Sequence, residues 1–194
     1  TVFRLEWDVD EDVRQIAEDF AAIHFGQKAA KGMADLFLLS PVAYKYGLYI
    51  EPVAYGEFNS LPHIRVGMFV AEGYPRIDHG REHLEFLRKI YLRCKPWETE
   101  TLMYLDHGLS TIESMLEQYK DIRPLITDTK SAEDVGTSLD MTRHLIRTNN
   151  LYVKLMFAYF DYREQRSDTC KVKLAALASD LKGTRDAFTQ IPGF

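Results

Sequence analysis

The chain has 194 residues, of which 46% are hydrophobic and 27% charged, the balance of one ordinary globular domain spanning residues 1–194. A net charge of −5, with no Lys/Arg run longer than two, argues against a nucleic-acid partner, because such proteins usually carry a basic face. No apolar run approaches the roughly 20 residues of a membrane span, and no signal-peptide pattern opens the chain, so we expect no membrane association.

The first predicted helix covers residues 10–25. Residues 1–7 alternate in part between apolar and polar types and look extended. After them, apolar residues recur at helical spacing. Asp8 or Asp10 can cap the N-terminus of this helix, and Gly26 is a natural stop after its last turn.

A second helix is expected from about Lys28 to about Gly47. Pro41 should break or kink it, because proline has no N–H to donate and its ring clashes with the preceding turn. Ser40 could then cap the restarted piece, with Pro41 in the tolerated first position.

Residues 49–78 form a long arm that shows no helical period and is interrupted by several prolines and glycines. Residues 64–70 could form a short strand within it. A connection of this length inside a compact domain is uncommon and often functional. Its many aromatic and aliphatic residues argue that it is ordered.

The second half of the sequence predicts further helices, ended by Pro96 and Pro124. Ser131 to Asp134 resembles a capping box at the start of the longest one. That helix is apolar on two sides, which is typical of a central helix, and Asn149 interrupts one apolar stripe, where it could specify pairing or hydrogen-bond the arm. The expected ranges are 80–96, 97–124, 131–163 and 167–188.

These patterns predict an all-α fold: five or six antiparallel helices in one bundle-like domain, with the irregular arm between the second and third helices. The arm is the candidate ligand-binding or interface region, because it sets aromatic rings beside planar polar groups, a mixture that suits sugars and carboxylates. The alternative is that these polar groups only tie the loop to the helices. The candidates are Tyr55, Phe58, Asn59, His63, Arg65, Tyr74, Arg76, Asp78, His79 and Arg81.

One metal pattern is present. His79 to His83 reads H-x-x-E-H, and histidines four apart on a helix can share a zinc ion. No third ligand follows in a matching helical context, and the alternative is a helix start capped by Asp78. Cys94 and Cys170 are expected as small buried hydrophobes. No nucleotide, acyl-transfer or Cys-based metal motif occurs, so no catalytic residue and no cofactor are predicted.

The opening of the chain resembles a known family. Arg4 to Asp8, then Val13 to Phe20, then His24-Phe25-Gly26, are similar to the segment that opens the helical C-terminal domain of α-glucuronidase-like glycoside hydrolases. The resemblance covers about the first 50 residues. It implies that the catalytic carboxylates lie in a preceding (β/α)8 barrel, which this sequence does not contain. It also implies that the helical domain supports the barrel, can reach the rim of its cleft and in some members mediates dimerisation.

We therefore expect a non-catalytic accessory domain of a carbohydrate-active enzyme. Its partners would be the catalytic barrel in the same chain, a carbohydrate substrate held by the parent enzyme and, in a homodimer, a second copy. The start without Met favours a piece of a longer protein. Two alternatives stay open: a stand-alone binding or dimerisation module, and a small zinc hydrolase using His79 and His83.

Overall fold

The structure is a computed structural model that describes residues 10–48 and 77–188. These residues form six α-helices and two short 3-10 turns, without a strand, so the predicted all-α bundle is confirmed. None of the described helices is long and apolar enough to cross a membrane. The elements are α2 (Val13–Phe25), α3 (Ala30–Gly47), α5 (Ile77–Cys94), η1 (Lys95–Trp97), α6 (Glu98–Ile122), η2 (Arg123–Leu125), α7 (Thr129–Gln165) and α8 (Asp168–Phe188).

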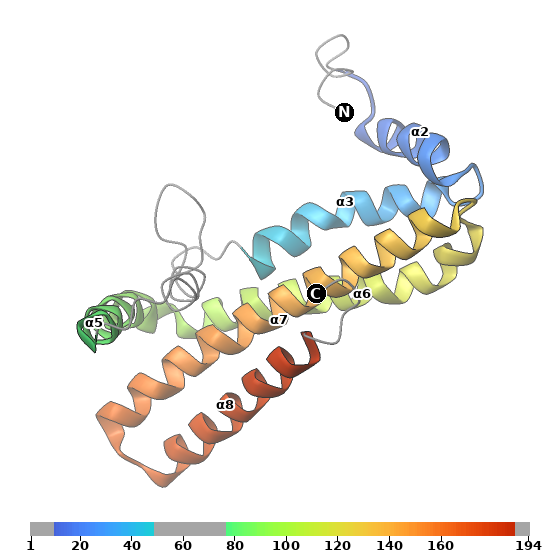
Figure 1. The fold of residues 1–194 in the computed structure, drawn as a ribbon. Coiled ribbons are helices and arrows are strands. Elements are labelled where there is room, and N and C mark those ends of the chain that lie inside the picture. Colours follow the sequence, from blue (N-terminus) through green and yellow to red (C-terminus); the bar gives the residue numbers. More distant parts are fainter. Residues whose placement is uncertain (1–9, 49–76, 189–194) are drawn as a thin grey trace.

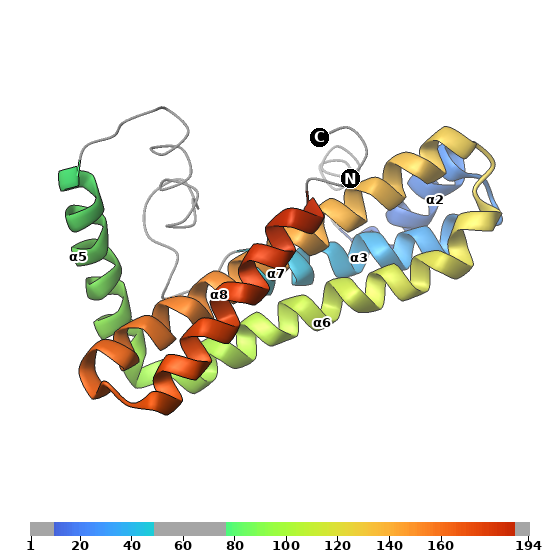
Figure 2. The ribbon, with the colours of Figure 1, turned by 60° about the horizontal axis from the view of Figure 1, so that its bottom comes forward.

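Three helices, α3, α6 and α7, run side by side and form the centre of the bundle (Figures 1 and 2). Along the α3–α6 contact, Gly32 faces Ile122 while Gly47 faces Gly108, so these two helices are antiparallel. The last helix, α8, turns back along the second half of α7. At opposite ends of the bundle, α2 packs on α3 and α5 projects outward (Figure 2).

The core is divided into two clusters that α7 joins. The first lies between α3, α6 and the first half of α7, where Leu139 and Ile146 are buried. The second lies where α5 meets α6 and the second half of α7, where Val153 and Phe157 are buried. Because α7 supplies buried residues to both clusters, its two apolar sides are explained by a central position, as predicted.

Two helices begin at aspartates that the sequence patterns did not single out. Asp12 caps α2 by accepting from the backbone N–H of Arg14 at 2.9 Å, so the predicted caps Asp8 and Asp10 are wrong. Asp128 caps α7 by accepting from the backbone N–H and the hydroxyl of Ser131, at 2.7 and 2.6 Å. Ser131 is therefore a donor inside the first turn, and the predicted capping box that began with it is wrong.

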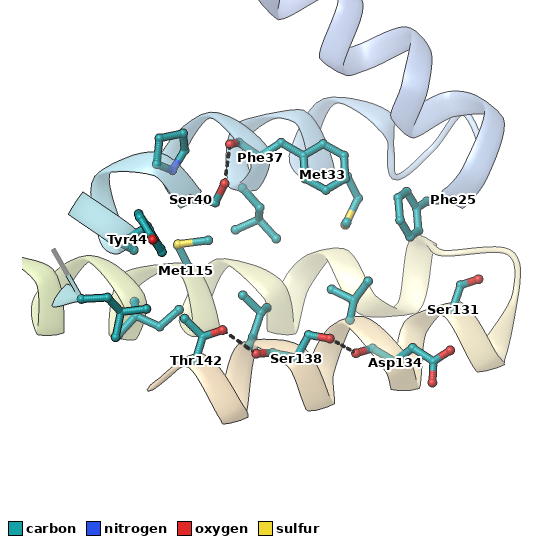
Figure 3. Close-up of a pocket in the computed structure, with 17 residues that line it drawn as sticks. Phe25, Met33, Phe37, Ser40, Tyr44, Met115, Ser131, Asp134, Ser138 and Thr142 are labelled. Atoms are coloured by element: carbon teal, nitrogen blue, oxygen red, sulfur yellow. Dashed lines mark hydrogen bonds between the residues drawn. The ribbon is translucent and has the colours of Figure 1, made fainter. Parts of the chain in front are cut away.

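Pro41 does not break α3, contrary to the prediction, because Ser40 replaces the missing donor. An N–H at position 41 would donate to the carbonyl of Phe37, and proline has none. The Ser40 hydroxyl donates to that same carbonyl at 2.9 Å (Figure 3). Helix α3 consequently continues to Gly47, the end that was predicted.

The helix expected from Gly80 begins at Ile77 instead. Asp78 is therefore part of the first turn of α5 and does not precede the helix as its cap. The arm between α3 and α5, residues 49–76, lies outside the described residues, together with the strand predicted within it.

Candidate functional site

Most residues predicted to form a binding site lie outside the described part of the chain. Tyr55, Phe58, Asn59, His63, Arg65, Tyr74 and Arg76 belong to residues 49–76. Asp78, His79, Arg81 and His83 lie in the first turns of α5, where the structure describes the backbone but not these side chains. Within the described residues, no group of three or more His, Cys, Asp or Glu side chains could hold a metal ion.

An open apolar cavity of about 750 Å³ lies between α3 and α7, above α6 (Figure 3), and we call it the α3–α7 groove. Its floor is made of buried Met33, Leu36, Ile112, Met115 and Leu139. Its wall on α3 presents Phe37, Pro41 and Tyr44, and Phe25 closes one end. A cavity of this size and lining is typical of sites that bind by burying apolar surface.

The polar groups along the α7 edge of the groove serve their own helix. The hydroxyls of Ser138 and Thr142 donate to the carbonyls of Asp134 and Ser138, each at 2.8 Å (Figure 3). Among the described residues that line the groove, only Asp134 is charged. The groove therefore offers apolar contact area with few polar groups to orient a small polar ligand.

The apolar surface of the groove continues onto α2. The rings of Phe25 and Phe37 are 5.9 Å apart, and the ring of Phe20 on α2 lies 5.7 Å from that of Phe37. Phe20 is 49% exposed and Ile23, one turn further along α2, is 79% exposed. A continuous exposed apolar surface of this kind marks an interaction site more often than an isolated exposed side chain does.

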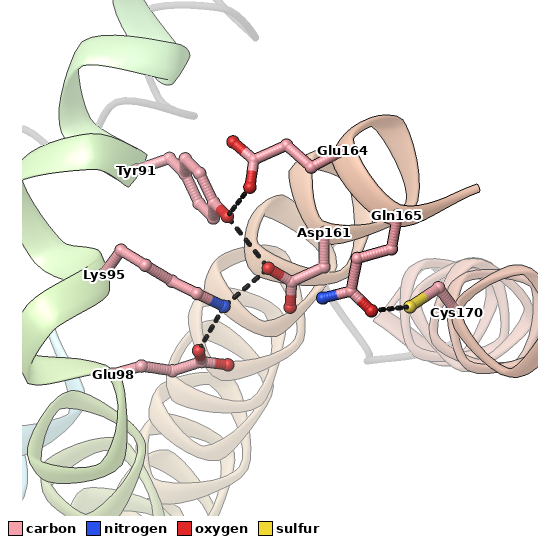
Figure 4. Close-up of polar contacts among 7 residues, drawn as sticks. All are labelled: Tyr91, Lys95, Glu98, Asp161, Glu164, Gln165 and Cys170. Atoms are coloured by element: carbon pink, nitrogen blue, oxygen red, sulfur yellow. Dashed lines mark hydrogen bonds and ion pairs between the residues drawn. The ribbon is translucent and has the colours of Figure 1, made fainter. Parts of the chain in front are cut away.

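A second site, which we call the Tyr91 cluster, joins α5 to α7 (Figure 4). It consists of Tyr91, Lys95, Glu98, Asp161 and Glu164. The Tyr91 hydroxyl lies 2.9 Å from Asp161 Oδ1 and 3.2 Å from Glu164 Oε2. Lys95 Nζ donates to Asp161 Oδ1 at 2.5 Å and to Glu98 Oε2 at 2.6 Å.

Both donors of the Tyr91 cluster hold their protons over the physiological range. Burial, followed by the hydrogen bond to Asp161, raises the pKa of Tyr91. Burial alone would lower the pKa of Lys95, but hydrogen bonds to Asp161 and Glu98 outweigh it and raise that pKa. Groups held so firmly in their protonated forms cannot serve as general bases near neutral pH, so this cluster is suited to holding helices together.

The end of α3 carries a third group of contacts. The rings of Tyr46 and Tyr104 stack at 5.4 Å, and His107 meets Tyr46 edge-on at 4.8 Å. The buried Asn149 donates to the carbonyl of Gly47 at 2.7 Å, so it fixes the last turn of α3. The sequence signal was the polar residue in an apolar stripe, and the hydrogen-bond partner is the residue that ends α3.

Asp106 and His107 both lie on the surface of α6. As neighbours on a helix, their side chains point about 100° apart. Asp106 accepts from Asn150 at 3.0 Å and from Lys154 at 2.7 Å. Burial opposes ionisation of Asp106, but these two hydrogen bonds outweigh it and lower the pKa of the carboxyl. Asp106 therefore links α6 to α7, whereas His107 contacts Tyr46 on α3, so the two side chains have separate partners.

The two cysteines differ. Cys94 is fully buried at the end of α5, as predicted, whereas Cys170 is only partly buried, with its thiol 3.4 Å from Gln165 Oε1 (Figure 4). Trp97, in the turn after α5, is 60% exposed although its size favours the core.

No family model, curated protein or solved structure matches this chain. The geometry defines the protein as an all-α bundle that carries an open apolar groove and an inter-helix polar cluster. Sequence patterns alone did not reveal the groove, because its lining combines residues such as Phe37 and Leu139, which are about a hundred positions apart.

Proposed function

We propose that this chain is an accessory, non-catalytic helical domain of a glycoside hydrolase, which packs against a (β/α)8 catalytic barrel through the α3–α7 groove and the adjoining face of α2. The observation that carries the proposal is the continuous apolar surface formed by the groove, Phe20 and Ile23. Exposed apolar area of this extent is stabilised when another protein surface covers it.

The order of elements at the start of the chain supports the glycoside hydrolase assignment. The resembling segment predicts an acidic helix, an aromatic-Gly stop and a second helix. The described residues contain α2 with Glu18 and Asp19, its end at Phe25 and Gly26, and then α3. Gly26 has a φ of +96°, a backbone conformation that favours glycine, so the stop has a physical basis in this chain.

The polar contacts between helices are also consistent with a structural role beside a catalytic domain, because their hydrogen bonds join helices of the bundle. Asp106 links α6 to α7, Asn149 links α7 to α3, and Asp161 links α7 to α5 and η1. Buried or half-buried polar groups used in this way specify how helices pair. They stabilise a rigid body that can present a surface to a neighbouring domain.

The first test is an activity assay of the purified 194-residue chain on aryl glycosides and glucuronoxylan fragments. The chain should show no turnover above a buffer control, because the proposal assigns the catalytic carboxylates to the barrel. Robust turnover by the isolated chain would sink the proposal.

The second test asks whether a barrel binds the surface described above. The reading frame upstream of Thr1 should encode a barrel domain, which is expressed separately and titrated with this chain. Ile23→Glu should weaken the association by tenfold or more, because it places a charge in an apolar interface. Val172→Glu on α8 is the matched control: Val172 is 69% exposed and also β-branched, but lies on a different helix. A reading frame without a barrel, or equal binding by both variants, contradicts the proposal.

A second candidate function is a stand-alone dimerisation module. It is favoured by the exposed side chains of Phe20 and Ile23 near the open α3–α7 groove. A protruding patch on one copy can fill the groove of a second copy across a two-fold axis. Sedimentation equilibrium of the chain alone tests this candidate. A dimer that Ile23→Glu dissociates supports this candidate, and a monomer at tens of micromolar excludes it.

A further inference from the structure

Among the described residues, the α5 side chains that are buried against the rest of the molecule lie near the C-terminal end of the helix. Its 18 residues make a rod about 27 Å long at the usual helical rise. Among its described side chains, Ile90, Tyr91 and Cys94 near the C-terminal end are buried, while Leu84 and Glu85 further out are exposed. Figure 2 shows the helix projecting away from the bundle beyond this junction.

The apolar part of the junction is centred on the ring of Tyr91. This ring stacks on Phe160 at 5.0 Å and meets Phe157 edge-on at 6.0 Å, both on α7. Lys95 Nζ lies 5.5 Å from the centre of the same ring. Tyr91 is 1% exposed, so its ring is buried between α7 and the lysine.

The polar part of the junction depends on one carboxylate. Asp161 Oδ1 accepts from both the Tyr91 hydroxyl and Lys95 Nζ (Figure 4). Glu164 competes for the same Tyr91 proton from 3.2 Å, and one hydroxyl can donate to only one acceptor at a time. Asp161 is thus the shared acceptor, and Glu164 is a surplus one.

We propose that Tyr91, Lys95 and Asp161 form a latch that holds α5 against α7, and that α5 opens as a separate unit when this latch is broken. An isolated helix of this length is marginal in water, so α5 loses its protection once it leaves α7. The bundle of α3, α6 and α7 has its own buried cluster, which includes Ile112 and Ile146, and stays folded.

The latch has a consequence for the residues predicted to bind ligands. Asp78, His79 and Arg81 lie in the first turns of α5, at the end far from the junction. Any rotation about the junction is therefore largest at these residues. The inference does not rest on the glycoside hydrolase function, since it follows from the contacts between α5 and α7 alone.

Hydrogen–deuterium exchange of the full 194-residue chain tests the latch. Asp161→Ala removes the carboxylate of the 2.5 Å ion pair with Lys95. Asp35→Ala is the matched control, because it removes the carboxylate of an ion pair of the same length, with Arg14 on α2. Asp161→Ala should speed exchange of the α5 amides by about 10- to 100-fold, the factor expected for a lost hydrogen bond to a charged group. Exchange in α3 and α6 should not change, and Asp35→Ala should leave α5 unaffected.

Two further variants test which groups protect the α5 amides from exchange. Tyr91→Phe keeps the buried ring and removes only the hydroxyl, so it tests the latch even if Asp161→Ala does not fold. Glu164→Gln should leave the exchange of α5 unchanged, because Asp161 remains the acceptor. The proposal is overturned if Asp161→Ala leaves α5 protected, or if α5 and α6 accelerate by the same factor. It is also overturned if α5 is already unprotected in the wild-type chain, or if Glu164→Gln opens α5 as Asp161→Ala does.

Discussion

Gly108 allows α3 and α6 to cross with their backbones in contact. A Cβ added at Gly108 would lie 2.5 Å from Gly47 Cα and closer still to Gly47 N. Carbon atoms in favourable contact are about 3.5–4.0 Å apart, so the two helices would have to separate by roughly 1 Å. Neither neighbour is a flexible side chain that could rotate away, because both atoms belong to the α3 backbone.

Gly108→Ala should therefore destabilise the fold despite its better helix propensity. In a helix interior, alanine is more stabilising than glycine by about 0.5–1 kcal/mol. Overpacking, in contrast, costs about 1–3 kcal/mol and occasionally more. Separation of the helices would also stretch the 2.7 Å hydrogen bond from Asn149 to Gly47, which places the cost at the upper end of that range. The net loss is about 2–2.5 kcal/mol, or roughly 4–10 °C in Tm for a domain of this size.

Urea titrations of Gly108→Ala and Gly183→Ala measure this directly. Gly183 lies in the interior of α8, and a Cβ there would meet nothing within 4 Å. The same chemical change should therefore raise stability at Gly183 and lower it at Gly108. A Gly108→Ala variant at least as stable as wild type would refute the reasoning, because the backbones would then tolerate the added methyl group.

Three other outcomes are expected. Ser40→Ala should lower the free energy of unfolding by about 1 kcal/mol, because the Phe37 carbonyl, which Pro41 cannot pair, loses its donor. Ser110→Ala is the control and should be neutral, because it removes a similar 2.9 Å bond to the His107 carbonyl, which a backbone N–H can also pair. Asn149→Ala should cost about 1–3 kcal/mol by leaving the carbonyl at the end of α3 unpaired. Asn149→Asp should cost more near neutral pH, and this excess should shrink as the pH falls towards about 4, because burial makes the introduced carboxyl protonate above its ordinary pKa. Burial raises the pKa of Tyr152 to about 12. The free energy of unfolding should therefore be intact below about pH 10, the ordinary pKa of tyrosine, and fall above it. In urea titrations at alkaline pH, Tyr152→Phe should lose less of its unfolding free energy than the wild type.

The order and extent of the helices could be predicted because apolar spacing reports which face of a helix is buried. In α6, Leu102, Leu105, Leu109, Ile112, Leu116 and Tyr119 recur at helical spacing; Leu105, Ile112 and Tyr119 are buried and the other three are half-buried. The starts of helices were less predictable, since several aspartates precede α2 and only the backbone conformation selects Asp12. The continuity of α3 through Pro41 depended on one hydroxyl, a contact that proline rules applied to the sequence do not include.

The candidate sites could be predicted only where one residue broke a pattern. Asn149 signalled a buried contact because it interrupts an apolar stripe, and that contact exists. The α3–α7 groove gave no such signal, because Phe37 and Leu139 are each ordinary core residues in their own helices. Tyr91 and its acceptor Asp161 are 70 residues apart, and sequence spacing carries no information about that pairing.

The described helices on either side of residues 49–76, α3 and α5, are held by different contacts, and this difference bears on any ligand that touches both helices. The end of α3 is held by backbone contact with Gly108 and by the hydrogen bond from Asn149 to the Gly47 carbonyl. Helix α5 is held by the Tyr91 latch at its C-terminal end. The last turn of α3 is therefore held by the bundle itself, whereas the first turns of α5 are held through a junction at the other end of their helix. A ligand that contacts both α3 and the first turns of α5 would bind the latched state more tightly than the open one, and by linkage would stabilise the latch in proportion to that difference.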